Sequence, residues 1–344
     1  MPSKKKTDKN KFTFLVLAVM ICANAGTLGA QSFWISNDNA AHNLVWKEKL
    51  ERRIEFLSDS LCEGRATGTR GATEAAFRIM SHFRQAGLMP FDSTYSKSFI
   101  AGEGITGHNI MGMLPGSRTR PCDSYIILGA HYDHLGILGG KMYPGADNNA
   151  SGVAALMSLC DMFSAMKTAG RAYGRNIIFV CFDAKEMNMA GSRAVWEMIE
   201  NGQLKDPLSG KPITKDKIYA MANLEQIGSS LAPLDSGRKD YLIALGNNTL
   251  PSEGTRRLLS LCNRFYGTML ELSETYYGSA KFTDIFYGIS DQKIFADNGI
   301  PAVFFTSGIT LNTFKTYDTV ETLDLDVLRK RIILIFHWAE KLLG

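Results

Sequence analysis

The chain has 344 residues, of which 45% are hydrophobic, 21% charged and 10% aromatic, so it contains enough apolar material for a large core. This composition excludes a disordered chain, a collagen-like fibre and a small disulfide-dense protein. The formal net charge of +4 lies in residues 1–30, which hold five lysines and one aspartate, so residues 31–344 are close to neutral. We therefore expect no nucleic acid among the partners of this protein.

The N-terminus has the pattern of a secretory signal. A basic stretch precedes the apolar run Phe12–Cys22, which has the length of a signal-peptide core and is too short to span a bilayer comfortably. Ala25 and Ala30 both fit as cleavage points. We predict a signal peptide over residues 1–30, a folded domain over residues 31–344, and export to the periplasm, the cell surface or the medium. The alternative is an uncleaved N-terminal anchor, which would be the only contact with a membrane.

Helical periodicity begins after this segment. The pattern predicts a helix over Asn39–Leu57, a glycine- and threonine-rich turn over residues 64–71, and an amphipathic helix over Ala72–Ala86. Gly87 is expected to end the second helix as its C-terminal cap. Further along, residues 102–107 (GEGITG) match a dinucleotide-binding pattern. A strand-like segment follows them instead of a helix, so we do not expect a nucleotide site there.

From about residue 105, short apolar strands alternate with helices. The predicted strands are Asn109–Leu114, Ser124–Ala130, Asn176–Asp183, Tyr219–Leu224, Tyr241–Leu245 and Ala302–Phe305. The predicted helices are Ser151–Ala169, Ser192–Asn201, Ser252–Tyr266, Ser290–Asn298 and Asp324–Leu343. Continuously apolar strands are typical of a sheet that is buried on both faces. The alternation therefore predicts one α/β domain with a mixed, mostly parallel sheet covered by helices.

Polar side chains follow three of the predicted strands at their carboxyl ends. His131 and Asp133 follow the strand Ser124–Ala130, and Lys185 and Glu186 follow Asn176–Asp183. Glu225 follows Tyr219–Leu224. A further carboxylate, Asp147, lies in a small-residue turn just before a helix. Because ligands of α/β sheets bind beyond the carboxyl ends of the strands, we expect these residues to converge on one sheet edge.

The residue types at this edge favour a metal site. An imidazole such as that of His131 is a good ligand for zinc, and Asp133 can hold its second nitrogen or fix the local turn. Asp147 can bridge two metals or cap the following helix. Each residue taken alone has a structural explanation, whereas four potential ligands at successive strand ends favour a metal. These four are His131, Asp147, Glu186 and Glu225.

An ordered set of short motifs resembles the secreted zinc aminopeptidases of metallopeptidase family 28, which also contains carboxypeptidases and glutaminyl cyclases. The motifs are residues 64–71 (GRATGTRG), 109–117 (NIMGMLPGS), 129–136 (GAHYDHLG), 144–153 (PGADNNASGV), 191–192 (GS), 290–304 (SDQKIFADNGIPAVF) and 318–324 (DTVETLD). The resemblance implies a three-layer α/β sandwich of the zinc-exopeptidase type, with helices on both faces of the sheet and two zinc ions at its edge.

The resemblance also implies roles for the residues at the sheet edge. His131 stands at the position of the histidine of the first metal, Asp133 at its supporting aspartate, Asp147 at the bridging carboxylate and Glu186 at the glutamate of the second metal. Glu225 stands where the family usually has an aspartate, which keeps a carboxylate and adds one methylene.

Three further positions depart from the family pattern. Lys185 stands at the general base, and an ammonium cannot accept a proton unless its pKa is depressed by several units. Phe314 stands at the final histidine ligand and cannot bind zinc. Gln292 replaces the histidine that usually follows the Ser-Asp pair.

These departures lead to two functional hypotheses. The first is an exported metallopeptidase of the aminopeptidase type that hydrolyses peptides with metal-activated water. The second is an inactive peptidase-like protein that binds a peptide, a glycan or a protein partner through the former cleft. We expect zinc as one ion or none, with the charge of Lys185 replacing the second zinc between Asp147 and Glu186. Gln292 and His134 are the expected substrate contacts.

Overall fold

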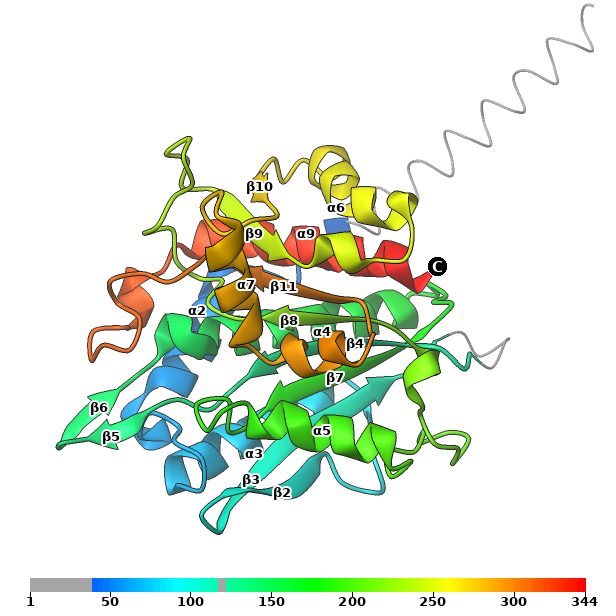
Figure 1. Ribbon diagram of the computed structural model, residues 1–344, viewed down its shortest axis with the longest axis horizontal. Coiled ribbons are helices and arrows are strands. Elements are labelled where there is room, and N and C mark those ends of the chain that lie inside the picture. The colour runs from blue at the N-terminus through cyan, green and yellow to red at the C-terminus, as the bar shows by residue number, and fades with distance from the viewer. Residues whose placement is uncertain (1–38, 117–121) are drawn as a thin grey trace, which may run out of the picture. The chain divides into compact units, whose positions relative to one another are not determined.

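The computed structural model describes residues 39–116 and 122–344 (Figure 1). The chain divides into two compact units, Met1–Leu44 and Val45–Gly344. In the first unit, residues 39–42 are helical, and the predicted signal peptide lies outside the described residues. None of the helices in the described ranges combines the length and the apolar character that crossing a bilayer requires. The folded elements below all belong to the second unit.

A nine-stranded mixed sheet forms the centre of this unit. Its strands are β1 (Met89–Pro90), β2 (Ser96–Gly102), β3 (Ile105–Leu114), β4 (Tyr125–His131), β7 (Asn176–Phe182), β8 (Ile218–Leu224), β9 (Tyr241–Leu245), β10 (Glu271–Ser273) and β11 (Ala302–Thr306). They lie in the order β1-β3-β7-β4-β8-β11-β9-β10, and β2 pairs with β3. The four central strands β7, β4, β8 and β11 are parallel to their neighbours within that group, whereas β3 and β9 join it antiparallel.

Helices cover both faces of the sheet, as predicted (Figure 1). The helices of one layer are α2 (Lys47–Ser58), α3 (Arg70–Gln85), α4 (Gly152–Thr168), α6 (Glu253–Phe265) and α9 (Leu325–Leu343). Those of the other layer are α5 (Ala190–Glu200), α7 (Ala280–Gly288) and α8 (Gln292–Asp297). Helix α4 is apolar almost all round because it packs between the sheet and the helices α2 and α9.

Alternate residues of the strands supply the two halves of the core. Phe179 of β7 faces Phe83 of α3 and Phe163 of α4 on one side. Its neighbours Ile178 and Val180 pack on the opposite side, toward α5 and α8, where Trp196 meets Phe295 edge-on. This two-sided burial explains why the central strands read as unbroken apolar runs in the sequence.

Several short elements depart from the expected pattern. The helix predicted to start at Asn39 begins its main run at Lys47, because Trp46 adopts an extended backbone conformation. Strand β2, the hairpin of β5 (Gly136–Leu138) and β6 (Lys141–Tyr143), strand β10 and helix α7 were not expected. Residues 102–107 lie at the turn between β2 and β3, which confirms that this glycine pattern does not open a helix.

Candidate functional site

The carboxyl ends of the parallel strands β4, β7 and β8 bring together most of the polar residues expected at one edge. The Asp133 carboxylate accepts hydrogen bonds from the backbone amides of Lys185 at 3.0 Å and of Glu186 at 2.9 Å. These two bonds fasten the loop after β7 to the loop after β4. The prediction that the strand ends converge is therefore confirmed for these loops.

The imidazole of His131 lies fully buried at the end of β4. Its Nδ1 donates to the backbone carbonyl oxygen of Asp133 at 3.1 Å, and its Nε2 lies 3.7 Å from Oε1 of Glu225. Burial alone would lower the pKa of His131, but the charge of Glu225 and the interaction with the Asp133 side chain raise it to about 10. Both ring nitrogens thus face oxygen atoms of the chain.

The ammonium of Lys185 lies between two glutamates. Its Nζ is 2.9 Å from Oε1 of Glu225 and 3.4 Å from Oε1 of Glu186, and its side chain is only 9% exposed. Burial would lower the pKa of Lys185, but the two carboxylates raise it above its usual range. Because a general base at this position needs a depressed pKa, Lys185 does not meet the condition for that role.

The Glu225 carboxylate has three side-chain partners at the edge. It contacts Lys185 and His131 through one oxygen and accepts a hydrogen bond from the hydroxyl of Ser290 through the other. Burial would raise the pKa of Glu225, yet the two cations hold it below its usual range.

Gln292 has a structural role, which differs from the expected substrate contact. Its side chain is fully buried, accepts a hydrogen bond from Asn223 at 3.2 Å and donates to the carbonyl oxygen of Tyr287 at 2.7 Å. Asn223 also donates to Ser290 at 2.7 Å. Gln292 thus supports the hydroxyl that binds Glu225 and does not reach a ligand surface.

His134 is likewise buried instead of open to a substrate. Its ring stacks on that of Phe314, with centroids 6.0 Å apart and planes 11° apart. Phe314 is 40% exposed and has a left-handed backbone conformation, with φ of 59°. Burial and the nearby charge of Arg65 hold the pKa of His134 well below its usual value, so this ring is neutral. Phe314 therefore covers His134 where the family would place a metal ligand.

Asp147 is held apart from the lysine. Its Oδ1 accepts hydrogen bonds from the amide of Gly228 at 2.8 Å and from the hydroxyl of Ser151 at 3.2 Å. The carboxylate of Asp318 accepts the backbone amide of Asp147 at 2.8 Å. Burial and the charge of Asp318 raise the pKa of Asp147 to about 7. Among the described residues, the Lys185 ammonium pairs with Glu225 and Glu186 and not with Asp147, so one of its two expected partners is wrong.

Asp291 and Asp318 belong to the site although we named neither as a candidate. Asp291 is fully buried, and burial raises its pKa to about 7 despite the positive charge of His131. Both aspartates lie inside sequence motifs quoted above. Their placement depends on long-range packing, because Asp318 reaches the turn before α4 from 171 residues away.

The side chains at this edge combine unpartnered donor atoms with carboxylates that a lysine already pairs. Within residues 39–116 and 122–344, no group of three or more His, Cys, Asp and Glu side chains lies close enough together to hold a metal ion. In the same ranges, Nε2 of His131 and Oδ2 of Asp147 are buried without a hydrogen-bond partner, which is the donor chemistry of a metal ligand. Glu186 and Glu225, however, already share the ammonium of Lys185.

The sheet order and the carboxylate-rich edge define an exopeptidase-like α/β protein. Residues 109–339 match the profile of peptidase family M28, so the chain belongs to this family. The BOS complex subunit ncln of Danio rerio is 29% identical over 168 residues, which cover 48% of this chain and 27% of that protein. The chain thus spans about a quarter of the length of this curated relative.

Solved structures share the same fold at low sequence identity. The LapA aminopeptidase of Legionella pneumophila has a TM-score of 0.65 and 17% identity, covering 90% of this chain and 75% of that one. A zinc aminopeptidase of Bacillus subtilis has a TM-score of 0.64 and 13% identity, covering 87% of this chain and 95% of that one. A glutaminyl cyclase of Macrostomum lignano has a TM-score of 0.66 and 16% identity, covering 89% of this chain and 92% of that one. The family and its fold are thus associated with zinc, while similar folds carry more than one activity.

Proposed function

We propose that this chain is a peptidase-family protein that binds a peptide or protein segment at the carboxyl edge of its sheet without hydrolysing it. The observation that carries the proposal is the Lys185 ammonium, which lies 2.9 Å from Glu225 and 3.4 Å from Glu186. A cation of the protein itself thereby neutralises two carboxylates that the resemblance assigns to metal binding. Zinc-dependent water activation at this edge would need those carboxylates free and a proton acceptor at position 185.

A small recess beside the ion pair supports a binding role. It has a volume of about 40 Å³, and its lining combines Lys185 and Glu225 with apolar side chains such as Phe286, Ile289 and Phe314. At this volume the recess can accept only the end of an apolar side chain, with the rest of a bound segment lying outside it. The relative ncln, named as a subunit of the BOS complex, also supports binding to a partner.

Metal-dependent hydrolysis is the second candidate function. The observation that favours it is a set of buried ligand atoms without hydrogen-bond partners in the described ranges, which includes Nε2 of His131, Oδ2 of Asp147 and both carboxylate oxygens of Asp291. A single zinc ion held by these residues would agree with membership of the family. The two candidates differ in zinc content and in turnover, which can be measured on the same preparation.

The test combines metal analysis, an aminopeptidase assay and a binding assay on the purified chain. We expect no zinc retained after dialysis, no release of p-nitroaniline from aminoacyl p-nitroanilides with added zinc, and measurable binding of Leu-Gly-Gly by calorimetry. Turnover that Asp147→Ala abolishes would establish the enzyme instead. The double variant Lys185→Glu, Phe314→His is expected to gain zinc binding, whereas the exposed control Lys239→Glu is not.

Export is proposed from the N-terminal pattern, which lies outside the described residues. The supporting features are the basic stretch and the apolar run Phe12–Cys22. Expression of the full chain in a secreting host, followed by N-terminal sequencing of the secreted and membrane fractions, tests the proposal. Cleavage near Ala25 or Ala30 is expected, and recovery of the intact N-terminus in the membrane fraction would indicate an anchor.

A further inference from the structure

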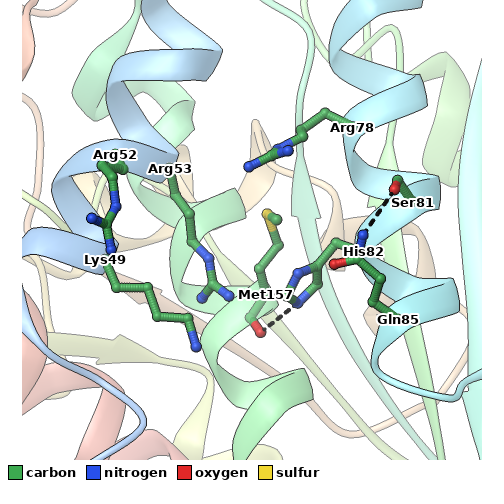
Figure 2. Close-up of a pocket in the computed structure, with 8 residues that line it drawn as sticks. All are labelled: Lys49, Arg52, Arg53, Arg78, Ser81, His82, Gln85 and Met157. Atoms are coloured by element: carbon green, nitrogen blue, oxygen red, sulfur yellow. Dashed lines mark hydrogen bonds between the residues drawn. The ribbon is translucent and has the colours of Figure 1, made fainter.

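A basic pocket lies on the helical layer between α2 and α3, and it shares no lining residue with the sheet-edge site. Its volume is about 270 Å³. Lys49, Arg52 and Arg53 line it from α2, and Arg78 and His82 line it from α3 (Figure 2). None of the lining residues is acidic.

One buried carboxylate neutralises part of this charge. Asp161 of α4 lies 2.6 Å from Nζ of Lys49, 2.6 Å from the guanidinium of Arg53 and 3.2 Å from Nε2 of His82. Burial would raise the pKa of Asp161, but its bonds to His82 and the charge of Arg53 hold it below its usual range. This single negative charge faces two permanent cations, so the floor of the pocket remains positive.

Two further guanidinium groups add to the excess of positive charge in the pocket. Arg52 and Arg78 have no carboxylate within ion-pair distance among the residues 39–116 and 122–344, and both side chains are exposed. Arg78 lies over the ring of Phe56, 5.2 Å from its centroid, and extends from α3 toward α2 (Figure 2). Arg53, by contrast, is only 8% exposed and donates to Ser158 at 2.8 Å. The pocket thus has a fixed cationic floor and two arginines at its rim.

From this geometry we propose that the pocket binds a small ligand through a phosphate group. Guanidinium groups pair with phosphate oxygens through parallel hydrogen bonds, which favours arginine-lined pockets for such ligands. A doubly charged oxyanion relieves the repulsion among four cations that share one carboxylate, whereas chloride offers less charge and no fork geometry. The volume suits free phosphate or a small phosphate monoester and is too small for most larger ligands.

Calorimetric titration at constant ionic strength tests the proposal with inorganic phosphate, glycerol 3-phosphate and sodium chloride as probes. We expect phosphate or its ester to bind with Kd below about 1 mM and chloride to give no saturable heat. The double variant Arg52→Gln, Arg78→Gln is expected to weaken binding at least tenfold. Arg84→Gln, an exposed arginine on α3 outside the pocket, is the matched control and should leave binding unchanged.

Each outcome of the titration bears on the proposal. Binding of the ester alone identifies a phosphate monoester as the ligand class, and binding of both probes identifies the phosphate group itself. Absence of saturable binding, or equal weakening in the double variant and in Arg84→Gln, overturns the proposal. A thermal unfolding curve verifies that the double variant is folded. If the double variant is not folded, Arg78→Lys takes its place. It keeps the positive charge but loses the paired hydrogen bonds of the guanidinium group, and it is expected to weaken binding several-fold.

Discussion

Replacing Lys185 by methionine tests whether an internal ion pair holds the sheet edge together. The ammonium is 9% exposed and contacts two carboxylates, of which Glu225 is 6% and Glu186 is 19% exposed. Removing one partner of a buried ion pair costs about 3–5 kcal/mol, because the other charge stays buried without compensation. Glu186 can relieve part of this cost by taking up a proton, since burial already raises its pKa. Glu225 has less freedom to do so.

Urea unfolding at pH 7 with EDTA, followed by circular dichroism, gives the free energy of unfolding. We expect Lys185→Met to lower it by about 3–5 kcal/mol without a change in the denaturant slope. The double variant Lys185→Met, Glu225→Gln should be more stable than Lys185→Met alone, which shows direct coupling. Lys217→Met is the matched control. It breaks the surface pair with Asp123 and should cost at most about 1 kcal/mol.

A loss in Lys185→Met no larger than that of Lys217→Met would refute the reasoning. A second contradictory result would be a large loss in EDTA that added zinc fully restores, because a metal would then be compensating the two carboxylates. Coupling near zero in the double variant would also count against the pair.

Three further predictions follow from other buried groups. Burial raises the pKa of Asp147 to about 7 in the folded state, against 3.8 in the unfolded chain. The folded state therefore holds the proton more tightly, and the free energy of unfolding falls as pH rises between these two values. Asp147→Asn should reduce the difference in unfolding free energy between pH 5 and pH 8, measured in urea. Arg65 donates to the carbonyls of Tyr132 and Gly145 among others, and Arg65→Lys, with fewer donors, should cost about 2–4 kcal/mol in the same assay. EDTA should leave the melting temperature of the wild-type chain unchanged within error, and a fall of several degrees in calorimetry would indicate a bound structural metal.

Local patterns in the sequence were sufficient for the parallel centre of the sheet. The central strands β4, β7 and β8 are short apolar runs that end in polar residues, and the structure places them within a residue of the predicted bounds. Helix α7 was missed although Phe282, Ile285 and Phe286 have helical spacing, because it is only nine residues long and none of its residues is buried. Strand β2 pairs with β3 and has no fully buried residue. Its sequence therefore lacks the apolar run by which the central strands were predicted.

The sequence was sufficient to predict the position of the site at the sheet edge, but not which side chains contact one another there. Residues at strand ends converge because parallel strands finish at one edge, which the sequence order already indicates. Whether Lys185 pairs with Asp147 or with Glu225 depends on distances between separate loops. The stacking of Phe314 on His134 joins residues that lie 180 positions apart in the chain, which no local pattern indicates.

The electrostatics of the edge bear on how strongly the fold depends on a metal. The Lys185 ammonium faces the carboxylates of Glu225 and Glu186, so a cation of the chain already compensates part of the negative charge there. Because a buried carboxylate is costly without a cation, we expect this pairing to reduce the need for an external one. A new cation at these two glutamates would have to displace the lysine. For this reason, a change at position 314 alone is not expected to restore a metal site while Lys185 stays in place.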